Sequence, residues 1–331
     1  MSPKQLKLGI SYYAQAIGIY WRLRKYLKHS FLKDLNFPSA LEREYFYGST
    51  YYNRTKQYMH ANHFFGELLC VLRGSKMDNA ERKRFANLSA CAPIFDDFFD
   101  KDKDELNKIN KLLNNVENEK SETEEQKLAA LFLQNILADI NNKTEFLNAA
   151  NQLFNAQAKA KKQQHFKSEA EHLWNLSRQK GGYSGLMYAL LLSHKLSDQE
   201  KGLAFELGAF GQFMDDVFDL YDDRAQGIFT LPNTSKTIKE IELFFESIMD
   251  SIIKKVENLD TKSQAKRDFV NILQIFAGAI RLAFQKYALI EVKYKISPKD
   301  CLQIERKHWI VDMEKPQNAF KMFRLGLSHL N

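Results

Sequence analysis

The chain is poor in the residues that build tight turns, with only 14 glycines and 6 prolines among 331 residues. An all-β protein needs turns every few residues, so this composition argues against that class. The three cysteines, Cys70, Cys91 and Cys301, have neither zinc-site nor disulfide-framework spacing, which indicates a reducing, cytoplasmic environment. No apolar run approaches the roughly 20 residues needed to span a membrane. No secretory signal is predicted either.

What the chain does contain is long, capped helical patterns and many rings, with 13% aromatic and 44% hydrophobic residues. We therefore predict an all-α protein with a large core and, in the absence of repeats or a linker, a single domain over residues 1–331. Capping signals are expected at Ser39, at Ser121 with Glu124, and at Ser197 with Glu200. The expected helices are 4–35, 54–75, one opening near 77 with a kink or restart at Pro93, one from 124, one within 174–192, 197–232, 236–258, 262–294 and 298–312.

The stretch Ser197–Pro232 carries the most distinctive pattern, because five aspartates fall near the end of an apolar-periodic helix. Asp215, Asp219 and Asp223 are spaced i, i+4, i+8, which predicts one line of carboxylates along the helix. Such charges repel one another and oppose the helix dipole at its C-terminal end. A hard cation such as Mg²⁺ would offset the repulsion, whereas the alternative is an acidic helix end bathed in water.

A second aspartate group, Asp96, Asp97 and Asp100, follows Pro93 between large apolar residues. A calcium loop starting at Asp100 is excluded, because Glu105 stands where that loop needs glycine. His60 and His63 have i, i+3 spacing but no ligand partner nearby, so we interpret them as structural.

Two basic segments have candidate roles. Arg178 and Lys180 precede Gly181-Gly182, and paired glycines in a helix mark a kink or a close approach, so these cations are candidate phosphate ligands. The helix pattern ending in Trp21–Lys33 is either a membrane-surface segment or a solvated face. The net charge of +7 with pI near 9.0 fits an anionic substrate held through metal ions. No nucleic-acid motif is present.

The two aspartate groups together resemble the class I isoprenoid synthase superfamily. DDFFD at 96–100 is similar to its first DDxxD motif, and DDVFD at 215–219 resembles the second, while DVFDLYDDRAQGIFTLP also resembles squalene and phytoene synthases. The resemblance covers roughly residues 54–232. It implies an antiparallel helical bundle with a central active-site cavity, a motif-bearing core of about 54–294, and two aspartate groups that face each other.

The resemblance also implies a Mg²⁺-dependent enzyme of isoprenoid (terpene) biosynthesis, with three ions bound together with the diphosphate of a prenyl substrate. Small residues four and five positions before the first motif imply a pocket for a long tail, of geranylgeranyl length or longer. The oligomeric state is left open, a homodimer included. The implied metal ligands are Asp96, Asp97, Asp100, Asp215, Asp216, Asp219 and Asp223, and the implied substrate contacts are Arg178, Lys180, Arg224, Cys91 and Ala92.

The chain departs from the two-substrate members of this superfamily. The Arg-Arg and Gly-Lys-Arg groups of chain-elongating synthases are missing, and Leu176 stands where squalene-type enzymes have tyrosine. We therefore expect a lyase that ionises one long prenyl diphosphate. The alternatives are a prenyltransferase that joins two prenyl diphosphates, with Arg73, Arg82, Lys83 and Arg84 rebuilding the second site, and a non-catalytic helical protein that binds a polyprenyl lipid.

Overall fold

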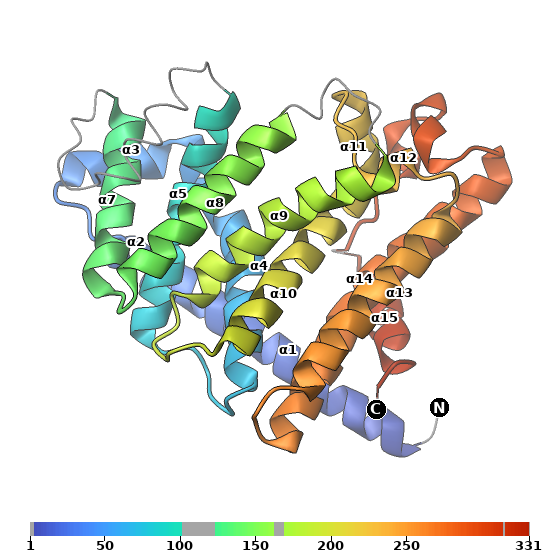
Figure 1. Ribbon diagram of the computed structural model, residues 1–331, viewed down its shortest axis with the longest axis horizontal. Coiled ribbons are helices and arrows are strands. Elements are labelled where there is room, and N and C mark those ends of the chain that lie inside the picture. The colour runs from blue at the N-terminus through green and yellow to red at the C-terminus, as the bar shows by residue number, and fades with distance from the viewer. Residues whose placement is uncertain (1–2, 101–122, 162–168, 314, 331) are drawn as a thin grey trace. The chain divides into compact units, whose positions relative to one another are not determined.

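The structure is a computed structural model that describes residues 3–100, 123–161, 169–313 and 315–330. Within these ranges every element is a helix (Figure 1), so the prediction of an all-α fold is confirmed. None of the described helices combines the length and apolar character needed to cross a bilayer. The region of the rejected calcium loop and the predicted cap at Ser121 lie almost entirely outside the described residues.

The described residues group into two compact units. Unit 1 comprises residues 1–16, 156–185 and 198–331, and unit 2 comprises 17–155 and 186–197. Helices α1 (Pro3–His29), α8 (Lys143–Ala160) and α9 (Ala170–Ala189) each have residues in both units. Because compact units of one chain need not fold independently, the expectation of a single domain stays a prediction.

Unit 2 is built around α4 (Thr50–Val71), α5 (Asn79–Asp100) and α7 (Glu124–Asp139). Helix α5 contacts both α4 and α7, and the shorter α2 (Phe31–Asp34) and α3 (Ala40–Gly48) pack beside them. Aromatic side chains fill the centre: Phe46 and Phe132 are fully buried, with ring centroids 5.5 Å apart. Part of the high aromatic content is thus used as core.

The helix caps observed in unit 2 agree only in part with those predicted from the sequence. Ser39 caps α3 by accepting from the amide of Glu42, as predicted. Helix α7 is capped by Thr123, whose side chain accepts from the amide of Gln126, whereas the predicted cap at Ser121 lies outside the described residues. Of the two outcomes expected at Pro93, the restart does not occur, because α5 runs through the proline without a break, and the kink stays a prediction.

Unit 1 contains α10 (Asp198–Phe218), α11 (Leu220–Ala225), α12 (Leu231–Thr234), α13 (Ile238–Glu257), α14 (Ser263–Tyr294) and α15 (Pro316–Leu327). The last three long helices lie side by side (Figure 1), and α14 contacts both α13 and α15. The predicted helix 298–312 is instead two 3₁₀ turns, η2 (Pro298–Gln303) and η3 (Arg306–His308). Pro298 stands in the first turn of η2, where a proline is tolerated, but such a start signal does not show how soon the turn ends.

The paired glycines of α9 mark a close helix–helix contact. A Cβ added to Gly181 would lie 2.4 Å from the carbonyl oxygen of Gly208 on α10, and one added to Gly208 would lie 2.2 Å from that of Gly181. Helix α9 continues without a break across this point and runs beside α10 (Figure 1). The small residues therefore let two backbones meet, and this contact brings the polar residues of α9 next to the aspartates of α10.

Candidate functional site

The second aspartate group lies where α10 passes into α11. The predicted single helix 197–232 is interrupted at Asp219, which falls between Phe218 and Leu220 with φ −92° and ψ 12°. The hydrogen bonds continue across the junction: the amide of Asp219 donates to the carbonyl of Asp215, and that of Asp223 to Asp219, each at 2.8 Å. Since i→i−4 bonding is kept, Asp215, Asp219 and Asp223 stay in register along one side, and we call these three residues the carboxylate ladder.

The ladder ends at a glycine cap. Gly227 has φ +75°, its amide bonds the carbonyl of Arg224, and the amide of Ile228 bonds that of Asp223 at 2.8 Å. This pair of bonds is the Schellman arrangement, in which a left-handed residue closes the last turn. The left-handed Gly227 therefore closes the end of α11.

Asp216 is turned away from the ladder toward α9. It retains only 5% of its exposed area, and both of its oxygens accept hydrogen bonds, from the Ser177 hydroxyl at 2.7 Å and the Gln212 amide at 2.8 Å. Burial raises the pKa of Asp216 to about 6, although these two hydrogen bonds oppose the shift. The sequence grouped Asp216 with the ladder residues, but its contacts join α9 to α10.

The ladder concentrates negative charge. The atoms packed around Asp219 desolvate its carboxylate even though part of the side chain is exposed, and this desolvation together with Asp215 and Asp222 raises its pKa to about 6. Burial, followed by repulsion from Asp216 and Asp219, raises the pKa of Asp223 to about 8. The site thus favours an added proton or an added cation.

Of the three predicted phosphate-binding cations, Lys180 is the best placed. Its charge lowers the pKa values of Asp216, Asp219 and Asp223, and within the described part of the chain it forms no ion pair or hydrogen bond of its own. Arg178 by contrast is engaged in a two-pronged pair with Glu206, at 2.6 and 3.3 Å.

Arg224 stacks over the ring of Phe229, 4.6 Å from its centroid. Of these three cations, Lys180 is therefore the most available to bind an anion. Arg178 would first have to break its ion pair with Glu206.

Another cation beside the ladder was missed by the sequence analysis. The guanidinium of Arg306, from η3, donates hydrogen bonds to both carboxylate oxygens of Asp222 at 2.5 Å. This hydrogen bonding lowers the pKa of Asp222. Asp222 is thereby neutralised by a cation from outside its own helix. No local signal links Arg306 to Asp222, since they are 84 positions apart.

The first aspartate group, at the end of α5 in unit 2, is bound by side chains of α4. The Tyr58 hydroxyl donates to Asp96 at 2.5 Å, and Arg54 forms an ion pair with Asp97. Arg54 and Tyr58 are spaced i, i+4, so one face of α4 presents both donors. Asp100 closes the described helix, but its side chain lies outside the described residues.

The predicted tail-pocket residues precede this group on α5. Cys91 is fully buried, and its thiol points to the carbonyl of Ala129 on α7 at 3.8 Å. Ala92, the next residue, is half-buried. A role for this pair in selecting tail length stays a prediction.

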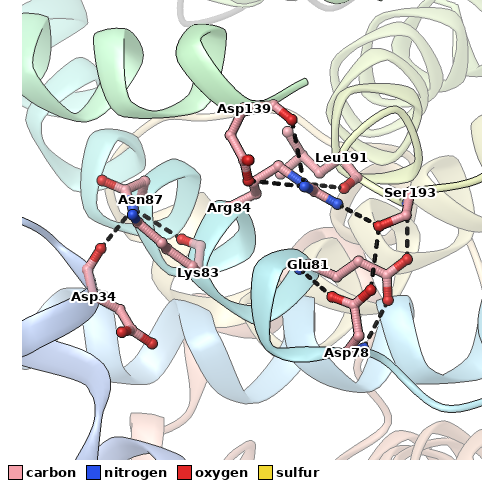
Figure 2. Close-up of polar contacts among 9 residues, drawn as sticks. All are labelled: Asp34, Asp78, Glu81, Lys83, Arg84, Asn87, Asp139, Leu191 and Ser193. Atoms are coloured by element: carbon pink, nitrogen blue, oxygen red, sulfur yellow. Dashed lines mark hydrogen bonds and ion pairs between the residues drawn. The ribbon is translucent and has the colours of Figure 1, made fainter. Parts of the chain in front are cut away.

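Three of the four cations that could have rebuilt a second diphosphate site, Arg73, Arg82 and Arg84, are already bound by protein groups. Figure 2 shows Arg84 at the centre of a polar network, donating to the Leu191 carbonyl at 2.7 Å, to Asp139 at 2.8 Å and to Ser193 at 2.8 Å. Only 6% of its surface is exposed. Arg82 contacts Glu67 at 3.3 Å, and Arg73 donates to the Lys195 carbonyl. These arginines hold unit 2 together.

Whether the residues fit Mg²⁺ depends on the geometry of the ladder. Among the described side chains, no group of three or more His, Cys, Asp or Glu closes around a common point. A line of i, i+4, i+8 residues extends over about 12 Å of helix, so it cannot form a cage around one ion. It does suit Mg²⁺ bound through one or two carboxylates, waters and substrate phosphates. The ladder therefore fits a metal–diphosphate complex better than a bare ion.

No family model matches this chain, and no match is found among curated proteins. The two aspartate groups belong to different units, so the facing arrangement that the resemblance implies stays a prediction.

Proposed function

We propose that this chain is a Mg²⁺-dependent class I isoprenoid synthase that ionises a long prenyl diphosphate and releases pyrophosphate. The observation that carries the proposal is the carboxylate ladder. Desolvation, with repulsion from the neighbouring aspartates as the next cause, raises the pKa values of Asp219 and Asp223 to about 6 and about 8. Carboxylates kept this close favour a bound cation, and a line of them suits an ion shared with a phosphate group.

In this proposal Asp215, Asp219 and Asp223 hold Mg²⁺, which, when bound, would neutralise charge on the departing diphosphate. Lys180 binds a diphosphate oxygen directly, as its position beside three of the aspartates allows. Asp96, Asp97 and Asp100 form the second metal-binding group, as the resemblance implies. For that role the hydrogen bond from Tyr58 to Asp96 and the ion pair of Arg54 with Asp97 must break.

A reaction of one substrate remains favoured over chain elongation. A second diphosphate held without metal needs several uncommitted cations, because burying its charge unpaired would be very unfavourable. Of the four cations available for this on and near α5, Arg84, Arg82 and Arg73 are engaged by protein acceptors, and Lys83 alone is too little charge for a second diphosphate. Radiolabelled isopentenyl diphosphate should therefore not enter a longer chain.

One observation favours a second candidate, a non-catalytic protein that binds a polyprenyl lipid. Arg54 already neutralises Asp97, so the first motif has an internal cation in place of a metal ion. A binder of this kind would take up prenyl compounds without Mg²⁺ and without releasing pyrophosphate.

The test is incubation with prenyl diphosphates of increasing length, with and without Mg²⁺, recording pyrophosphate and organic products. We expect Mg²⁺-dependent release that stops with a chelator. Asp219→Asn should lower kcat/KM by roughly a hundredfold or more, since an electrostatic contact to the leaving group is lost. The matched control is Asp222→Asn, which removes a carboxylate from the same turn but one that Arg306 already neutralises. Equal activity in both variants contradicts the ladder assignment, and binding without any release supports the lipid-binding candidate.

A further inference from the structure

Helix α1 exposes an aromatic and apolar stripe that continues into a basic one. Ile17, Tyr20 and Trp21 retain 38%, 46% and 57% of their exposed area. The next exposed side chains on this face are basic, at three, four and seven positions after Trp21, a spacing that keeps them on one side of the helix. We call the six residues the α1 stripe: Ile17, Tyr20, Trp21, Arg24, Lys25 and Lys28.

The pattern extends onto α4. The ring of Tyr20 stacks on exposed His60, with centroids 5.8 Å apart. Lys56 and Tyr52 continue from His60 at four-residue steps along α4, and the Lys56 ammonium lies 4.1 Å from the centroid of the Tyr52 ring. Rings and cations therefore alternate across two helices of unit 2, so the surface is broader than a single helix face.

The charged side chains of the first 33 residues are all basic. No Asp or Glu occurs before Asp34, whereas seven Lys and Arg do, an excess equal to the net charge of the whole chain. Arg22, on the opposite side of α1, is already paired with Glu67 at 2.9 Å. The guanidinium of Arg24 instead lies 5.6 Å from the Trp21 ring centroid. An anionic partner would thus meet cations that no carboxylate of their own helix neutralises.

We propose that the α1 stripe docks on the surface of an anionic lipid bilayer. Trp21 and Tyr20 lie in the interfacial layer, where amphipathic rings are most stable, and Ile17 reaches the acyl boundary. Arg24, Lys25 and Lys28 contact the anionic headgroups. A single-stranded nucleic acid would use the rings and the cations too, but it offers nothing to the exposed aliphatic side chain of Ile17. This inference does not rest on the proposed function.

The test is co-sedimentation of the full chain with vesicles of mixed phosphatidylcholine and phosphatidylserine, compared with pure phosphatidylcholine. We expect binding to the mixed vesicles that weakens with salt, and a blue shift of tryptophan emission that is lost in Trp21→Phe. The triple variant Arg24→Glu/Lys25→Glu/Lys28→Glu should lower the partition coefficient at least about tenfold, because each cation near an anionic surface contributes to binding.

The matched control reverses three exposed lysines elsewhere, Lys254→Glu/Lys262→Glu/Lys299→Glu, so that the net charge changes equally. It should bind nearly as well as the wild type, and circular dichroism should show both triple variants folded. Equal loss in the two variants, no preference for the mixed vesicles, or no blue shift on binding would overturn the proposal. Stronger binding to a single-stranded oligonucleotide than to the mixed vesicles, lost in the stripe variant, would replace lipid with nucleic acid.

Discussion

Glu67 lies beside three basic side chains of its own unit. Arg22 binds both of its oxygens, at 3.1 and 2.9 Å, Arg82 approaches at 3.3 Å and His63 at 3.5 Å. Burial alone would raise the pKa of Glu67, but the contacts with His63 and Arg22 outweigh it and lower the pKa to about 2. Three helices, α1, α4 and α5, therefore meet at one ionised carboxylate.

Because the pKa of Glu67 is lowered in the folded protein, the free energy of unfolding should depend on pH. Because its folded pKa lies below the usual 4.5, the stabilisation is complete above that pH and is lost as the pH falls toward about 2. The loss should reach about 3 kcal/mol in the free energy of unfolding. Glu67→Gln should be less stable at neutral pH by about 3 kcal/mol, since it leaves partly buried arginines uncompensated, and should show a flatter acid profile.

Denaturant unfolding at a series of pH values measures both effects. Glu44→Gln, which removes a carboxylate from an exposed position, is the control and should keep the profile of the wild type. An unchanged acid slope in Glu67→Gln would show that other groups control the acid response.

The contact of α9 with α10 depends on glycines rather than on apolar periodicity. A Cβ at Gly208 would meet the Gly181 oxygen at 2.2 Å and the Gly185 Cα at 2.8 Å, both of them backbone atoms that cannot turn aside. Gly211, three residues later on the same helix, has nothing within 4 Å of such a Cβ. One helix thus offers a constrained glycine and an unconstrained one.

We expect opposite outcomes for alanine at the two positions. Gly208→Ala should destabilise the protein by about 2 kcal/mol or more, because the helices must separate. Gly211→Ala should stabilise it by about 0.5–1 kcal/mol through helix propensity. Thermal unfolding by circular dichroism measures both, and equal midpoints in the two variants would argue against the close crossing. If Gly208→Ala also weakens Mg²⁺-dependent activity while Gly211→Ala does not, the crossing positions the ladder.

At the scale of the whole molecule, α1, α8 and α9 each have residues in both compact units. A helix is stabilised cooperatively along its length, so melting in one unit should propagate into the other. We expect one unfolding transition. Single-tryptophan variants can test this, with Trp21 reporting unit 2 and the buried Trp309 reporting unit 1. Coincident midpoints support one domain, and separate midpoints show two.

The sequence by itself determined the all-α class and most helix limits, because helices depend on local rules: i→i−4 bonding, caps within four residues, and a period of about 3.6. It also placed the ladder in one line, since that spacing belongs to a single helix. Its errors include Asp219, where the helix is interrupted, and 298–312, where short turns replace a helix.

Only the tertiary structure decided which groups meet the aspartates. Arg54 reaches Asp97 across 43 positions, Ser177 reaches Asp216 across 39, and Arg306 reaches Asp222 across 84. Such pairs form when whole helices pack against one another, so no periodicity within either helix encodes them. The same holds for the paired glycines: the sequence marked them as unusual, and packing showed that their neighbour is a helix backbone.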